Sequence, residues 1–205
     1  ETGLFTTKSD YLRIINLAKL RNISLDQQFN LKEHTQKLEY DKLIIIANEL
    51  DRYKKEYGLI DYNDMILDFV KSDKSPKFEV VFVDEAQDLS RMQWDMVGSF
   101  NTQDSFIAGD DDQAIFRWAG ADVDSFITQK GKILNLTQSM RIPRKIHDYA
   151  MKIIERVSNR LHKEWKPKSH EGAISKHWNF EDINMNKGNW LVLTRTRYQL
   201  KALED

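Results

Sequence analysis

Two adjacent carboxylates, Asp84 and Glu85, follow an almost unbroken apolar run over residues 78–83. The run is rich in β-branched and aromatic residues, a composition typical of a strand buried on both faces. In an open α/β sheet, ligands bind outside the carboxyl ends of the strands, so the two acids would lie where a ligand binds. The alternative is a helix N-terminus, where acids complement the helix dipole.

A second acid-ended strand follows along the chain. Residues 105–109 are predicted to form a short buried strand, and they lead directly into Asp110, Asp111 and Asp112, with Gln113 next. Two neighbouring strands that both end in carboxylates concentrate negative charge at one edge of a sheet. Such charge is costly unless a cation or a cationic side chain lies there, and a hard divalent ion is the simplest explanation.

A helix is predicted over residues 38–57, and Gly58 suits its C-cap because glycine accepts the left-handed conformation. The apolar positions of this helix recur at helical spacing. They are Ile46, Leu50, Tyr53 and Tyr57. The residues before it show looser periodicity, so residues 1–60 are predicted to be a polar, helical region.

Two further helices carry N-terminal signals on either side of the strand at residues 78–83. Asp61 is predicted to be an N-cap, with Asp64 at the third helical position. Ser90 and Gln93 have the spacing of a capping box. The first acid-ended strand is therefore expected to be flanked by helices in sequence.

The last third of the chain contains weaker signals. Residues 132–136 and 190–195 are candidate strands, and a helix is predicted over residues 198–205. Pro143 suits the first position of another helix, whose apolar face is expected to pack against a core. That face consists of Ile146, Tyr149, Ala150, Ile153, Ile154, Val157 and Leu161.

Composition limits the classes of protein. The sequence of 205 residues has 31% charged residues and no cysteine, which excludes disulfides, thiolate metal sites and cysteine nucleophiles. No run is long enough to span a membrane and no signal pattern is present, so a cytoplasmic location is expected. The net charge of −1 hides an asymmetry, because residues 61–130 carry 6 basic and 15 acidic groups whereas residues 131–205 carry 15 and 8. A basic face can therefore still bind a polyanion.

Three strings of residues, in this order and spacing, resemble motifs of the UvrD/Rep-like superfamily 1 DNA helicases. They are Val-Asp-Glu-Ala-Gln-Asp at residues 83–88, Gly-Asp-Asp-Asp-Gln-Ala-Ile-Phe-Arg-Trp-Ala-Gly-Ala-Asp at residues 109–122, and Leu-Thr-Gln-Ser-Met-Arg at residues 136–141. The resemblance extends from about residue 40 to the end. It implies an α/β fold, a partial RecA-like P-loop NTPase motor domain with a mainly parallel sheet flanked by helices.

The same resemblance implies a division of the chain. Residues 1–60 correspond to a helical insertion, residues 61–161 to part of the first motor domain, and residues 162–205 to a linker and the start of the second motor domain. It also implies ATP and Mg²⁺ as ligands.

The resemblance assigns roles to four polar residues. Asp84 would hold Mg²⁺, usually through water, and Glu85, beside the metal, would orient and deprotonate the water that attacks the γ-phosphate. Gln113 resembles the side chain that senses the γ-phosphate. Arg141 resembles the arginine that stabilises charge developing there.

Two aromatic residues resemble contacts to DNA. Trp118 is similar to the ring on which a single-stranded base stacks, and Phe116 to a neighbouring supporting ring. Stacking suits a motor because every base has a π-face. The alternative for both is ordinary core packing, which the surrounding motif disfavours for Trp118 and leaves open for Phe116.

The sequence also departs from the family. It contains no Gly-x-x-x-x-Gly-Lys-[Ser/Thr] phosphate loop. It also lacks the family's late motifs, which complete the second wall of the ATP cleft. Ala119 stands where arginine is frequent in the family, and Ser139-Met140 stands where Asn-Tyr is common. The chain is therefore expected to be a fragment of a helicase. Its longer parent is expected to translocate on single-stranded DNA and to unwind duplex DNA with 3′-to-5′ polarity, whereas the fragment alone is expected not to hydrolyse ATP. The alternatives are a non-catalytic nucleic-acid-binding or interaction module and a subunit of a nucleotide-dependent nuclease.

Overall fold

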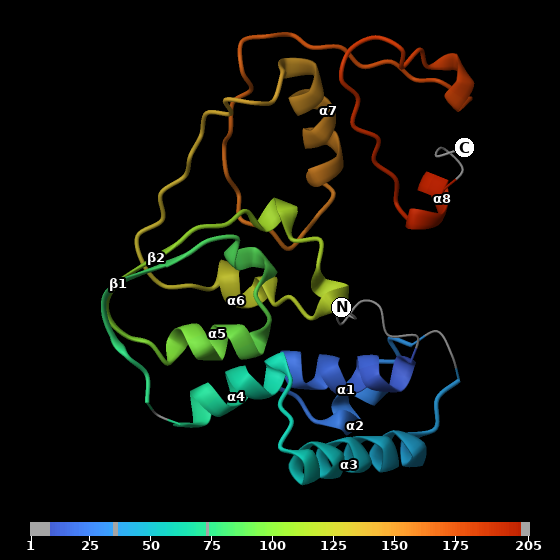
Figure 1. Cartoon of the computed structure of the whole chain (residues 1–205). Helices are drawn as coiled ribbons and strands as arrows, with labels where there is room; N and C mark the ends of the chain where they lie inside the picture. The colour runs from blue at the N-terminus through green and yellow to red at the C-terminus, as the bar shows by residue number, and fades with distance from the viewer. Residues whose placement is uncertain (1–8, 35–36, 73, 202–205) are drawn as a thin grey trace. The chain divides into compact units, whose positions relative to one another are not determined.

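A computed structural model describes residues 9–34, 37–72 and 74–201 (Figure 1). The described residues form two compact units. The first comprises Glu1–Asn135 and Ile154–Glu164, and the second comprises Leu136–Ile153 and Trp165–Asp205. Each unit is described by itself.

The first unit contains helices, two strands and short 3₁₀ helices. Its helices are α1 (Asp10–Arg21), α2 (Leu25–Asn30), α3 (Tyr40–Tyr57), α4 (Tyr62–Ser72), α5 (Arg91–Gly98) and α6 (Val123–Ile127). The strands are β1 (Lys77–Val83) and β2 (Asn101–Ile107), and the 3₁₀ helices are η1 (Ala86–Asp88), η2 (Asp111–Gln113) and η3 (Arg117–Ala119). The second unit is built around α7 (Arg144–Ile154), η4 (Phe180–Asp182) and α8 (Arg197–Lys201).

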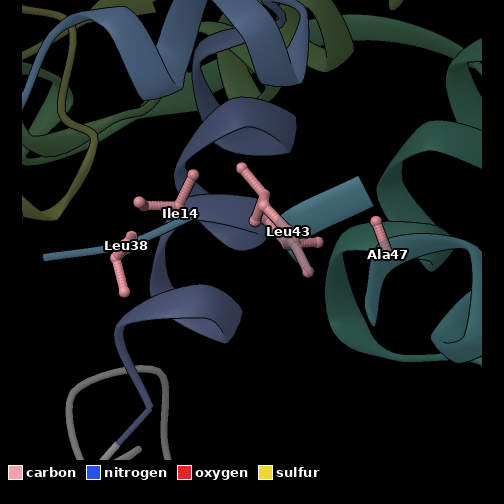
Figure 2. Close-up of a cluster of buried hydrophobic side chains, with 5 residues drawn as sticks. Ile14, Leu38, Leu43 and Ala47 are labelled. Atoms are coloured by element: carbon pink, nitrogen blue, oxygen red, sulfur yellow. The ribbon is translucent and has the colours of Figure 1, made fainter. Parts of the chain in front are cut away.

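A hydrophobic cluster joins α1 to α3. Figure 2 shows Ile14 of α1 beside Leu43 of α3, with Leu38 and Ala47 at the same interface. The predicted helix over residues 38–57 is confirmed, and it ends at Gly58 in the left-handed conformation (φ 61°). Of the residues at helical spacing, Tyr53 and Tyr57 are exposed, and their tilted rings contact each other with centroids 4.6 Å apart. The buried positions are those that meet α1.

The start of α4 is held by a reciprocal cap, as predicted. The backbone N–H of Asp64 donates to Oδ1 of Asp61 at 2.8 Å, and the N–H of Asp61 donates to Oδ2 of Asp64 at 3.1 Å. Lys19 of α1 and Lys54 of α3 also donate to Asp64, at 2.8 and 2.6 Å. Burial raises the pKa of Asp64, but the bonds from the two lysines outweigh it and the pKa lies well below its ordinary value. This carboxylate therefore ties α4 to α1 and α3.

Strands β1 and β2 pair in parallel, with Lys77 opposite Asn101 and Val83 opposite Ile107. An α/β architecture with a small parallel sheet is therefore present. The predictions that the first strand is buried on both faces and that the second is buried are wrong. Phe82 and Phe106 stack with ring centroids 5.0 Å apart, yet are 76% and 56% exposed. Within the described residues the sheet has two strands only, so no third strand extends it.

The two later strand predictions are wrong. Residues 132–136 and 190–195 run without a strand ladder, and Leu136 and Leu193 are 96% and 82% exposed. Their apolar composition suits a strand, but a strand needs a neighbour to complete its backbone hydrogen bonds, and none pairs with either segment in the described residues.

Helix α7 also differs from its prediction. It begins just after Pro143, whose carbonyl accepts a bond from His147 N at 2.9 Å, but it ends at Ile154 instead of continuing to Leu161. None of its residues is buried, so the expectation that it packs against a core is wrong here.

The predicted helix over residues 198–205 is present as α8, and residues 202–205 lie outside the described part of the chain. Across residues 9–34, 37–72 and 74–201, no helix combines the length and apolar character required to cross a bilayer.

Candidate nucleotide and nucleic-acid site

The backbone turns sharply where β1 ends. Glu85 adopts the left-handed conformation (φ 51°, ψ 39°), and its N–H donates to Oδ1 of Asp84 at 2.9 Å. Ala86 N donates to Ala108 O at 3.0 Å, which joins this turn to the residues just after β2. A non-glycine residue in this conformation costs on the order of 1–3 kcal/mol, and such strain concentrates at functional sites. The turn leaves the side chains of Asp84 and Glu85 exposed at the carboxyl edge of the sheet.

Gln87 lies behind these acids and is 1% exposed. Its Nε2 donates to Oε2 of Glu85 at 2.8 Å, and its Oε1 accepts from the N–H of Asp110 at 3.0 Å. One buried amide thus connects the ends of the two strands. The sequence shows Gln87 within a motif, but its role depends on a contact between residues 23 positions apart, which spacing does not predict.

The acids after β1 fit a hydrated cation. Asp88 Oδ1 is buried and has no hydrogen-bond donor among the described residues. Burial, and then the charge of Glu85, raise the pKa of Asp88, so this corner has uncompensated negative charge. No cluster of three or more acidic or histidine ligands occurs in the described residues. Because Mg²⁺ usually keeps several waters and takes only one or two carboxylates, Asp84 and Glu85 still suit it.

The acids after β2 are neutralised by cationic side chains. Lys163 donates to Asp110 at 2.6 Å and also binds Asp111, whose side chain is 2% exposed. Arg160 forms two bonds of 2.7 Å with Asp112. At this acid run, cationic side chains, the alternative to a divalent ion, therefore balance the negative charge.

Both cations come from the segment Ile154–Glu164, which we call the strap. The N–H of Leu161 donates to Asp111 at 2.7 Å, so the backbone of the strap also participates. Burial lowers the pKa of Lys163, but its bonds to Asp110 and Asp111 outweigh it and the pKa is raised. This pairing was not predicted from the sequence, because the basic last third of the chain was interpreted as a face for a polyanion.

Gln113 lies in η2 and belongs to the same network. Its Nε2 donates to Oδ2 of Asp110 at 2.7 Å, while Lys163 binds the other oxygen of this carboxylate. Asp110 is thus shared by Gln113, Lys163 and, through its backbone, Gln87. Burial raises the pKa of Asp110, but the bonds from Lys163 and Gln113 outweigh it and hold the pKa low. Glu85 and Gln113 are therefore joined through two intervening residues, the side chain of Gln87 and both the backbone N–H and the carboxylate of Asp110.

Trp118 and Phe116 lie at η3 and are not core residues. Their side chains are 57% and 41% exposed, with ring centroids 6.4 Å apart. Trp118 lines an open pocket of about 790 Å³ in the first unit. Its other lining residues are Arg21, Asn22, Leu31, Glu33, Arg91, Arg117, Gly120, Ala121, Asp122 and Asp124. Arginines beside an exposed tryptophan are suited to a single-stranded nucleic acid.

Close packing beside the pocket requires a glycine. Gly120 has a φ of 103°, and a Cβ there would lie 3.1 Å from Cβ of Leu20 in α1. Nearby, Arg21 of α1 donates to Glu33 at 2.5 Å and to the carbonyl of Arg117 at 3.3 Å. Helix α1 therefore contributes directly to the wall of this pocket.

Arg141 belongs to the second unit, in the loop before α7. Its N–H donates to Oγ of Ser139 at 3.3 Å, and the same oxygen accepts from Ile142 N at 2.9 Å. Ser139, one of the departures from the family pattern, thus orders the loop, and the Arg141 residue is exposed.

Two known proteins with similar sequences are helicases. ATP-dependent DNA helicase PcrA of Bacillus subtilis is 29% identical over 151 residues, covering 65% of this chain and 20% of that protein. DNA helicase II of Haemophilus influenzae is 30% identical over 121 residues, 52% of this chain and 17% of that protein. The chain thus spans about a fifth or less of the length of these two relatives.

A family model gives the same result over a longer stretch. The model of the UvrD/REP helicase N-terminal domain matches residues 4–134, well over half of the chain. The matched region contains Asp84, Glu85, Gln113 and Trp118. By its sequence, this chain belongs to the UvrD/REP helicase family.

Proposed function

We propose that this chain is part of the motor of an ATP-dependent DNA helicase. The observation that carries the proposal is the joined network at the carboxyl edge of the sheet, in which Glu85 and Gln113 are linked through Gln87 and Asp110. A protein with only a structural role has no need for exposed carboxylates on a strained turn, one of which accepts a hydrogen bond from the buried amide of Gln87. The names of the relatives, ATP-dependent DNA helicase and DNA helicase II, support the same activity.

The proposed chemistry is hydrolysis of the γ-phosphate of ATP. Asp84 would hold Mg²⁺, with Glu85 beside it, and the metal when bound would neutralise charge on the phosphates. Glu85 orients and deprotonates the attacking water. Gln113 donates its amide to the γ-phosphate in exchange for Asp110, and Arg141 stabilises charge that develops during transfer.

The proposed domain organisation follows the family. Residues 1–60 form a helical insertion, residues 61–161 contribute to a first RecA-like motor domain, and residues 162–205 form a linker and the beginning of a second. The remaining parts of both motor domains, including a phosphate loop, would come from the rest of a longer chain. Translocation on single-stranded DNA with 3′-to-5′ polarity, unwinding of duplex DNA and a cytoplasmic location complete the proposal.

The proposed function is tested by comparing two proteins. The full-length gene product is expected to hydrolyse ATP faster when single-stranded DNA is added, whereas residues 1–205 alone are expected to be inactive, because phosphoryl transfer depends on a phosphate cradle that this sequence lacks. Phosphate release is the measurement. DNA-stimulated, Glu85-dependent hydrolysis by residues 1–205 alone would contradict the expectation, and no hydrolysis by the gene product would refute the function.

A second candidate is a nucleic-acid-binding module without hydrolysis, and the exposed Trp118 beside the arginines of the pocket is the observation that favours it. The two candidates share the pocket beside Trp118 and differ in the need for Glu85. A gene product that binds single-stranded DNA but neither binds nor hydrolyses ATP would select the binding module.

Replacing Trp118 by alanine is expected to weaken binding of single-stranded DNA to the gene product by about 1–3 kcal/mol, the usual contribution of one stacked base. The exposed ring at the edge of the pocket is the physical reason. Fluorescence anisotropy with a labelled oligothymidine measures the dissociation constant. Trp118→Phe retains a π-face and should restore most of the affinity, and Tyr62→Ala, at a ring that is 84% exposed on α4, is the control. Equal affinities for the wild type and Trp118→Ala would show that the ring does not contact DNA.

A further inference from the structure

Gln87 is the most completely buried polar side chain beside the proposed catalytic acids, and the family roles above do not include it. It is 1% exposed and uses both ends of its amide. The Nε2 group donates to Glu85 at 2.8 Å, and Oε1 accepts from the backbone N–H of Asp110 at 3.0 Å. We propose that Gln87 is a positioning residue that fixes the carboxylate of Glu85 relative to the end of β2, where Gln113 is held.

The local geometry leaves Glu85 dependent on this amide. Its backbone lies in the left-handed region (φ 51°) and its side chain is exposed, so little packing restricts the carboxylate. The side-chain hydrogen bond that this carboxylate accepts comes from Gln87. A general base must lie within hydrogen-bond reach of the group whose proton it takes, so a carboxylate held through one oxygen keeps the other for that contact.

The space for the amide is provided by Gly109. A Cβ at residue 109 would lie 2.6 Å from Oε1 of Gln87 and 3.0 Å from the ring of Phe126. Such a separation is too short for a van der Waals contact, so a larger residue would displace the amide from Asp110 N. Gly109 is therefore needed for the two hydrogen bonds of Gln87, even though its own backbone is not strained.

The hydrogen bonds of Gln87 connect Glu85, the proposed base, to Gln113, the proposed phosphate sensor. The backbone N–H of Asp110 donates to Gln87, and the carboxylate of Asp110 accepts from Gln113 at 2.7 Å. When Gln113 leaves Asp110 for a phosphate, the backbone N–H of Asp110 still holds Gln87 and hence Glu85. The inference rests on the proposed hydrolysis and assigns to it a residue that sets the geometry of the base without touching the nucleotide.

The kinetic test uses Gln87→Leu in the full-length gene product. Leucine has a similar volume but forms neither bond, so kcat for ATP hydrolysis is expected to fall about 10- to 100-fold while KM for ATP stays unchanged. Gly109→Ala should reproduce the effect with Gln87 still present. Gln93→Leu is the matched control: it removes the capping box of α5 and lowers stability without reducing kcat. If Gln87→Leu changed kcat no more than Gln93→Leu does, or if it only increased KM for ATP, the positioning role would be refuted.

A second measurement does not depend on hydrolysis. In residues 1–205, the amide proton of Asp110 is expected to exchange slowly with solvent by NMR, and its exchange should accelerate at least tenfold in Gln87→Leu but not in Gln93→Leu. Unchanged exchange would refute the bridge itself. If the gene product does not hydrolyse ATP, the proposed function and the catalytic part of this inference both fail, while the exchange rates still decide whether Gln87 joins the two strand ends.

Discussion

Replacing Glu85 by glutamine is expected to lower kcat for ATP hydrolysis by the full-length gene product by about 10²–10⁴-fold, the usual contribution of a general base. The amide has nearly the same shape as the carboxylate but cannot accept a proton from water. Nucleotide affinity should change little, because the backbone turn and Asp84 remain. Phosphate release under saturating ATP and single-stranded DNA measures kcat, and equilibrium binding of a fluorescent nucleotide measures affinity.

The control for this experiment is Glu79→Gln, at an exposed glutamate on β1 six residues before Glu85. It removes one negative charge without touching the strand end, so its kcat should equal that of the wild type. A Glu85→Gln protein that retains more than a tenth of the wild-type kcat would remove Glu85 from the role of base.

The second large effect concerns stability. Lys163→Met is expected to reduce the free energy of unfolding by about 3 kcal/mol, because it leaves the buried carboxylate of Asp111 without its cation. The methionine keeps most of the aliphatic length, so the loss reports the charge and its hydrogen bonds and not an empty space. Urea unfolding of residues 1–205, followed by circular dichroism, measures the change.

Lys168→Met is the matched control for the strap, since Lys168 lies five residues further along and is exposed. Its replacement should change the free energy of unfolding by less than about 0.5 kcal/mol. Combining Lys163→Met with Asp111→Asn should recover part of the loss, because the carboxylate that needs the cation is then absent. A loss for Lys163→Met no larger than for Lys168→Met would mean that the strap is not held by these charges.

Local signals predicted the local structure well. Gly58 ends α3, Asp61 and Asp64 cap each other, and Ser90 with Gln93 forms the capping box of α5, because each depends on groups within four residues. The parallel pairing of the two acid-ended strands was also predictable. Burial was not: the composition around Phe82 suits a central strand, but burial depends on elements that cover it, and the sequence of a strand does not contain them.

The candidate site was predictable in its residue types but not in its connections. Motif spacing identified Asp84, Glu85 and Gln113, yet their order in space depends on Gln87, whose partners lie two and 23 positions away. The cationic side chain that neutralises Asp111 is Lys163, 52 residues further along the chain. Contacts of that separation follow from the fold, so the sequence supplied the charges without showing which would meet.

The uncovered sheet determines how this polypeptide behaves at high concentration. Strands β1 and β2 present unpaired backbone edges, and the stacked rings of Phe82 and Phe106 meet water on one face. Unprotected edges and apolar rings of this kind recruit other chains, which leads to aggregation and to capture by chaperones during synthesis. Residues 1–205 are therefore expected to stay monomeric in the dilute samples of an unfolding measurement and to associate through β1 and β2 as the protein concentration rises.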